Sequence, residues 1–136
     1  NFPTWFRELR PIYGGFEAGL DRFIDLGKND FIGREKAMEE KRTGGKLRRV
    51  SMIVDAADCD VLGDEPIWHD GKVVGWVTSG GYAHYVDKSM AQGYVPKELA
   101  NDLGKGAFAI EIIGDNRKAT IITDPLFDPE GKRMRA

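Results

Sequence analysis

The sequence predicts a mainly β domain, an antiparallel barrel or sandwich with one short helix in front of it. Three observations lead to this prediction. From residue 48 onward, Gly, Asp and Pro divide the chain into short β-rich segments. The pair Asp70-Gly71, a strong signal for a hairpin turn, joins two of these segments. A single run before them, from Arg34 to Arg42, has the spacing of a helix.

The sequence indicates both one face of the predicted helix and the point at which it ends. Ala37, Met38 and Lys41 are spaced to lie on one face, and Gly44-Gly45 provides the stop. Residues 1–16 are rich in aromatic and turn-forming residues but keep neither a helical nor a strand period. We interpret residues 1–16 as an arm or linker that lies on another surface.

The β-rich segments have the spacing of hairpins. We expect strands at residues 49–54, 66–69, 72–77, 90–95, 107–113 and 118–122. The stretch from Val77 to His84 is expected to be a loop. Its Gly80-Gly81 pair either forms an anion-binding nest or makes a tight exit from the strand. It matches neither a P-loop nor a dinucleotide fingerprint, because no lysine and no helical pattern follow.

Composition points to one ordinary domain. The chain has 136 residues, of which 41% are hydrophobic and 31% charged, enough for a single core. The longest apolar runs are far shorter than the roughly 20 residues of a membrane span, and no signal-peptide pattern opens the chain. With one cysteine there is no disulfide framework. A reducing compartment, with cytoplasmic localisation, is the expectation.

The net charge of −2 conceals an asymmetry, +3 over residues 1–49 and −5 over the rest. The basic excess is concentrated in Lys41, Arg42, Lys46, Arg48 and Arg49. It is either a patch for an anionic ligand, such as a polyglutamate tail or a phosphate, or the solvated end of a helix. Nucleic-acid-binding domains are usually much more basic, so no nucleic-acid partner is expected.

Catalytic and metal-binding patterns are absent. His69 and His84, with one cysteine, do not form a metal set by spacing. The carboxylates around Cys59 disfavour a thiolate nucleophile and lack the ligand spacing of a calcium loop. We therefore predict no catalytic residue and no metal site.

Five motifs nevertheless follow one another in a fixed order. They are Glu17-Ala18-Gly19-Leu20, Asp30-Phe31-Ile32-Gly33-Arg34-Glu35, Gly75-Trp76-Val77-Thr78-Ser79-Gly80-Gly81, Ala91-Gln92-Gly93-Tyr94-Val95 and Asp124-Pro125-Leu126-Phe127-Asp128-Pro129. In this order and with these gaps, the chain resembles the C-terminal part of the glycine cleavage T-protein (aminomethyltransferase) family. The resemblance is closest to the branch found in sarcosine and dimethylglycine dehydrogenases, and it covers roughly residues 15–136.

The resemblance implies a C-terminal barrel, Greek-key or jelly-roll-like, of a tetrahydrofolate-dependent one-carbon transfer enzyme. It divides the chain into an arm or linker (1–16), the end of a middle subdomain with the short helix (17–47) and the barrel (48–136). In the family, the catalytic aspartate and a glutamate and an arginine that grip the folate lie upstream of the Glu17 motif. The chain alone is therefore expected to be inactive.

Three residues inherit a folate- or substrate-binding role from the resemblance. Phe23 takes an aromatic position three residues after Leu20, and Lys132 and Arg133 lie in the tail where the family places a substrate contact. The cofactor implied is tetrahydrofolate. The partners implied are the upstream folate-binding and catalytic subdomains or a separate flavoprotein, with a homo-oligomer left open. Which methylated amine is the substrate is not encoded in these residues.

A second hypothesis comes from a different class of protein. Exposed aromatic side chains on an arm are unfavourable unless something covers them. The chain would then be a non-catalytic binding or assembly module of the same fold, which dimerises or caps a protein partner through Trp5, Phe6, Tyr13 and Phe16.

Overall fold

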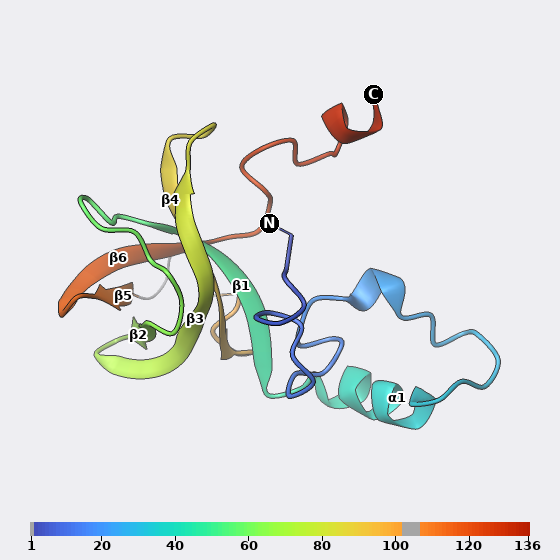
Figure 1. Cartoon of the computed structure of the whole chain (residues 1–136). Helices are drawn as coiled ribbons and strands as arrows, with labels where there is room; N and C mark the ends of the chain where they lie inside the picture. Colours follow the sequence, from blue (N-terminus) through green and yellow to red (C-terminus); the bar gives the residue numbers. More distant parts are fainter. Residues whose placement is uncertain (1, 102–106) are drawn as a thin grey trace.

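Six antiparallel strands form a closed barrel in the computed structural model, which describes residues 2–101 and 107–136 (Figure 1). The strands are β1 (Leu47–Val54), β2 (Pro66–His69), β3 (Lys72–Ala83), β4 (Lys88–Pro96), β5 (Phe108–Ile112) and β6 (Asp115–Ile122). Their order around the barrel is β1-β4-β3-β2-β5-β6, and β6 pairs with β1 to close it. Strands β2, β3 and β4 follow one another and β1 lies beside β4, which is a Greek key. The predicted mainly β barrel is confirmed.

The short helix is also confirmed. Helix α1 (Arg34–Thr43) stands to one side of the barrel (Figure 1). It ends at Gly44, which adopts a φ of 79° and donates its N–H to the carbonyl of Glu40. Two 3-10 turns, η1 (Asp21–Phe23) and η2 (Arg133–Arg135), have no counterpart in the prediction.

Alternate residues of a β-strand point to the same face of the sheet. In this barrel, the residues that face the interior are mostly apolar. In β5, for example, Phe108, Ile110 and Ile112 are buried and the residues between them are not. The hairpin at Asp70-Gly71 forms as predicted, with φ angles of 47° and 76° that suit its two-residue turn. The turn sets His69 of β2 opposite Lys72 of β3.

The predicted loop after Val77 is wrong, because β3 continues as a strand to Ala83. A shift in register between Val77 and Ser79 lets the strand go on, and Gly80 then pairs with Ala91 of β4. A Cβ at Gly80 would lie 2.2 Å from a methyl carbon of Val61 and 2.8 Å from the carbonyl oxygen of Met90. Glycine therefore serves close packing at this position. Neither the anion-binding nest nor the strand exit is formed.

Candidate functional site

The two tail residues predicted to bind folate lie beyond the last strand. Arg133 lies in η2, and its guanidinium is 5.6 Å from the ring centroid of Tyr85 and 5.5 Å from that of Phe127. These two rings meet edge to face at 4.4 Å. The carboxylate of Asp128 accepts the backbone N–H groups of Arg133 and Met134 and holds the turn. The tail thus places one cation on an aromatic platform at the β3–β4 connection.

The other two predicted binding residues, Lys132 and Phe23, are exposed and make few contacts. Lys132 forms an exposed ion pair with Glu130. Phe23 lies in η1 with 68% of its surface exposed, and the guanidinium of Arg22 lies 4.6 Å from its ring centroid. Within residues 2–101 and 107–136, no hydrogen bond, ion pair or ring contact joins Phe23 to the tail. Lys132 and Arg133 are thus neighbours in the sequence with different contacts, and the structure leaves Phe23 apart from both.

The predicted basic patch divides into two parts. Lys41 and Arg42 are exposed at the end of α1 and complement its dipole. Arg48 instead pairs with Asp21 at 3.1 Å. Arg49 donates to the carbonyl of Ala18 and, at 2.6 Å, to Gln92.

The two engaged arginines attach the N-terminal segment to the barrel. Burial lowers the pKa of Arg49 from its usual value. Arg48 and Arg49 also line a cavity of about 380 Å³ between β1 and β6. Their guanidinium groups are already bound within the chain, so the solvated-helix interpretation applies to Lys41 and Arg42. Lys46, the fifth residue of the predicted patch, is exposed as well.

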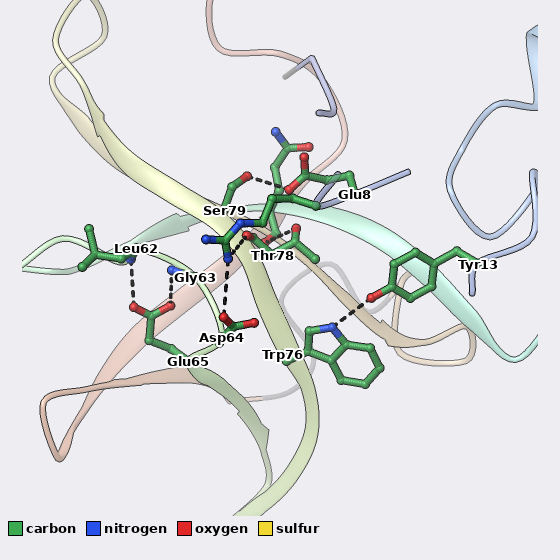
Figure 2. A network of polar contacts seen from close by, with 11 residues as sticks. Glu8, Tyr13, Leu62, Gly63, Asp64, Glu65, Trp76, Thr78 and Ser79 are labelled. Atoms are coloured by element: carbon green, nitrogen blue, oxygen red, sulfur yellow. Dashed lines mark hydrogen bonds and ion pairs between the residues drawn. The ribbon is translucent and has the colours of Figure 1, made fainter. Parts of the chain in front are cut away.

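The arm lies on the barrel of its own chain. Glu8 is fully buried, and its carboxylate accepts a hydrogen bond from the Ser79 hydroxyl at 2.7 Å (Figure 2). It also accepts hydrogen bonds from the amide and the hydroxyl of Thr4, each at 2.7 Å. The hydroxyl of Tyr94 donates to the backbone carbonyl of Glu8 at 2.6 Å. Burial raises the pKa of Glu8, but hydrogen bonds from Thr78, Thr4 and Ser79 outweigh burial and lower it below the usual 4.5.

A second contact between arm and barrel is aromatic. The ring of Tyr13 stacks on Tyr94 with centroids 3.7 Å apart. The hydroxyl of Tyr13 accepts the indole N–H of Trp76 at 3.0 Å (Figure 2). Phe16 is buried. Of the four aromatics assigned to partner capture, Tyr13 and Phe16 are therefore used within the chain. Trp5 and Phe6 stay exposed.

Between the arm and β3 lies a cavity of about 290 Å³. It is lined by Phe6, Arg7, Arg10 and Tyr13 of the arm and by Asp64, Trp76 and Thr78 of the barrel. This site was missed at the sequence level. The arm has no periodic pattern, and nothing in the sequence pairs residues 6–13 with residues 64–78.

The two histidines and Asp58 make contacts with nearby side chains. His69 packs on Phe108 at 4.4 Å and His84 on Tyr82 at 5.0 Å. Asp58 pairs with Arg117 at 3.0 Å. No cluster of three His, Cys, Asp or Glu side chains able to hold a metal occurs in the part of the chain that the structure describes. Nor does any helix there have the length and apolarity to cross a membrane.

Comparison with known proteins gives concordant results. Residues 47–128 match the glycine cleavage T-protein C-terminal barrel domain family. Over 135 residues the chain is 41% identical to the mitochondrial dimethylglycine dehydrogenase of Mus musculus, covering 98% of this chain but 15% of that protein. It is 31% identical over 141 residues to the mitochondrial sarcosine dehydrogenase of the same species, covering 99% of this chain and 15% of that protein. The chain thus spans about a seventh of these relatives' length.

Shorter relatives and a solved structure extend the comparison. The chain is 34% identical over 133 residues to an aminomethyltransferase of Desulfitobacterium hafniense (strain Y51), covering 96% of this chain and 35% of that protein. The crystal structure of glycine cleavage system aminomethyltransferase T from Bartonella henselae superimposes with a TM-score of 0.81 at 20% identity. That match covers 91% of this chain and 35% of the solved one and shows a shared fold. Because the family match spans more than half of the sequence and coincides with the six-stranded barrel, the chain belongs to the glycine cleavage T-protein C-terminal barrel domain family.

Proposed function

We propose that this chain is the part of a tetrahydrofolate-dependent one-carbon transfer enzyme that closes the folate site without carrying out the chemistry. The enzyme would be of the dimethylglycine or sarcosine dehydrogenase type, as the names of the more similar relatives indicate. The observation that carries the proposal is Arg133 held over the rings of Tyr85 and Phe127. A cation on an aromatic platform suits a ligand with planar rings and carboxylates.

Within this proposal, Arg133 and Lys132 meet the acidic end of the folate. Phe23 offers its exposed ring from η1. Since Phe23 and the tail are not in contact, the site requires further walls. The upstream folate-binding and catalytic subdomains, or a separate flavoprotein, would provide these walls. The proposal keeps the division of the chain into an arm (1–16), the end of a middle subdomain (17–47) and the barrel (48–136). A cleft with one wall missing orients a ligand poorly, so the isolated chain is proposed to bind folate weakly and to be inactive.

The proposed localisation is a reducing compartment, cytoplasmic as first expected, because a single free cysteine suits such a compartment. The mammalian relatives are named as mitochondrial enzymes, which makes the mitochondrial matrix the alternative. Fluorescent tagging of the full-length gene product in cells distinguishes the two.

The test is calorimetric titration of the chain with tetrahydrofolate and 5-formyltetrahydrofolate under reducing conditions. We expect a dissociation constant of about 100 μM, equivalent to roughly 5–6 kcal/mol. Arg133→Ala and Phe23→Ala should each weaken binding about tenfold, corresponding to about 1.4 kcal/mol. Arg42→Ala, which removes an exposed arginine at the far end of α1, is the matched control and should leave binding unchanged.

If titration at millimolar ligand gave no heat of binding, the proposal would be contradicted. The chain would then share the fold of the family without its folate site. The assembly-module alternative would then be favoured by a specific observation, the exposure of Trp5 and Phe6 at 77% and 59%.

A further inference from the structure

The turn formed by residues 14–17 holds a carboxylate that comes from α1. The Oε1 atom of Glu40 lies 2.8 Å from the backbone nitrogen of Phe16 and 2.9 Å from that of Glu17, so two successive N–H groups donate to one oxygen. A Cβ at Gly14 would lie 2.2 Å from the same oxygen and 2.3 Å from the carboxylate carbon. The glycine therefore leaves the space that the carboxylate takes. Successive backbone N–H groups that converge in this way form an anion-binding nest.

The same turn is attached to the barrel by contacts that do not involve α1. Phe16 is buried, and its carbonyl accepts a hydrogen bond from the guanidinium of Arg48. The carbonyl of Glu17 accepts the backbone N–H of Arg49, in β1, at 2.8 Å. The side chain of Arg49 also donates to the carbonyl of Ala18 at 2.9 Å. The turn and β1 thus build the nest, and α1 supplies the anion.

Helix α1 is held beside the barrel by polar contacts. None of its ten residues, all of which the structure describes, is buried. Within residues 2–101 and 107–136, the other side-chain hydrogen bonds between α1 and its surroundings join Arg34 to the carbonyl of Leu26 and Lys97 to the carbonyl of Thr43. Leu26 belongs to the loop of residues 24–33, which extends away from the barrel (Figure 1). Because most helices in proteins are stabilised by burying an apolar face, the position of α1 depends on the Glu40 contact.

Two glycines join α1 to β1. Gly44 and Gly45 have φ angles of 79° and 67°, in the left-handed region that glycine enters without strain. The carboxylate of Glu17 accepts the backbone N–H of Lys46 at 2.6 Å and that of Leu47 at 3.0 Å. The backbone is therefore anchored from Lys46 onward, and rotation of the helix is easiest at the two glycines.

From these observations we propose that the 14–17 turn is an oxyanion-binding nest, and that the Glu40 carboxylate occupies it as the latch of a detachable helix. When the carboxylate leaves the nest, α1 swings away from the barrel about Gly44 and Gly45. The emptied nest accepts a carboxylate or a phosphate, since each presents an oxygen to two adjacent N–H groups. The residues proposed to bind folate take no part, so the latch stands or fails independently of them.

Amide hydrogen exchange in the 136-residue chain tests the latch. Glu40→Ala should speed exchange of the Phe16 and Glu17 amides about tenfold, because both lose a charged acceptor. Glu40→Gln keeps a neutral acceptor and should give an intermediate rate. The Arg49 amide, which donates to the Glu17 carbonyl, should keep its rate. Glu39→Ala removes an exposed carboxylate one residue away on α1 and, as the matched control, should change none of these rates.

The Glu40→Ala chain also tests the nest. Acetate and phosphate are the probes, and they distinguish a carboxylate from a phosphate as the ligand class. Titration should move the amide signals of Phe16 and Glu17 in a saturable way, with a dissociation constant of about 0.1 M or lower for at least one probe. The unaltered chain should show no such shift, because Glu40 already occupies the nest. Sodium chloride at the same ionic strength separates binding from screening.

A pair of spin labels follows the position of the helix. The labels are attached at Lys36→Cys in α1 and Lys72→Cys at the start of β3, both exposed, in a chain that carries Cys59→Ser. Pulsed electron paramagnetic resonance should give one narrow distance distribution when Glu40 is present. Addition of Glu40→Ala should produce a second, broader distribution at a different distance.

Four outcomes would overturn the proposal. Unchanged exchange of the Phe16 and Glu17 amides in Glu40→Ala would show that the carboxylate is no latch. Equal acceleration of the Arg49 amide would show that Glu40 stabilises the turn as a whole. Amide signals that do not move at about 0.5 M of either anion would show that the turn is not a nest. An unchanged label distance would show that other contacts hold α1.

Discussion

Glu8 shows how one side chain can fix an irregular segment. Its carboxylate is buried and is surrounded by donors from Thr4 and Ser79. A buried carboxylate is tolerated only when donors of this kind replace its water. The ionised form of Glu8 therefore contributes to folding.

Glu8→Gln should lower the free energy of unfolding at pH 7 by about 1–3 kcal/mol, because charge-assisted bonds become neutral or are lost. The pKa of Glu8 is lowered in the folded chain. Its contribution is thus complete above the usual carboxyl pKa of 4.5 and is lost as the pH falls through the lower folded value.

Urea unfolding of both chains at pH 7 and at pH 3 measures this effect. The difference between them should shrink at the lower pH. Glu98→Gln, an exposed carboxylate, is the control and should behave as the unaltered chain. A difference that stays the same at both pH values would contradict the role given to the charge.

At Gly75, β3 leaves no room for a side chain beside β4. A Cβ at Gly75 would lie 2.0 Å from the carbonyl oxygen of Tyr94. Gly75→Ala should therefore destabilise the chain by about 1–3 kcal/mol, since backbone must shift to make room. At Gly71, where φ is 76° but no atom lies within 4 Å of the added Cβ, alanine should cost less, about 1 kcal/mol. Thermal unfolding of the two variants ranks them, and equal losses would show that the close approach is unimportant.

The arm is the second element with a checkable attachment. Tyr94→Phe removes the bond to the Glu8 carbonyl, worth about 1 kcal/mol, and should raise the opening of the arm about fivefold. Trypsin cleavage after Arg7 measures this opening directly. Tyr82→Phe removes a hydroxyl that donates to Asp87 on the surface, and it should leave the cleavage rate unchanged. An unaltered rate in Tyr94→Phe would mean that the other contacts of the arm, such as the Ser79–Glu8 hydrogen bond, hold it without the Tyr94 hydroxyl.

These elements also show what the sequence does and does not encode. Local signals predict α1 to within one residue at its end, Arg42 against Thr43, and the turn at Asp70-Gly71, because capping and turn chemistry act over a few residues. Gly80 was read as a turn residue, whereas its role is set by Val61, which lies far away in the sequence. The buried Glu8 and the cavity beside it depend on such distant contacts too, so no local pattern could predict them.

At the scale of the whole molecule, the arm leaves several large aromatic side chains exposed to solvent. Phe2, Trp5 and Phe6 expose 74%, 77% and 59% of their surface. A cluster of this kind favours association. The double replacement Trp5→Ser and Phe6→Ser should reduce both self-association in sedimentation velocity and fluorescence of a bound hydrophobic dye.

The control for that prediction is Ile32→Ser, because Ile32 is fully exposed ahead of α1 and away from the arm. It should leave sedimentation unchanged. Identical monomeric profiles for the unaltered chain and the double variant would remove the support for the assembly-module hypothesis.

The pairing of the first strand with the last has a consequence for synthesis. Residues 51–54 of β1 find their partners in residues 119–122 of β6, so a chain emerging from the ribosome exposes two open sheet edges until β6 has also emerged. Contacts between such distant segments slow folding. A nascent chain of this family consequently passes through a window in which another strand can take the place of β6, and that window ends only when translation has passed residue 122.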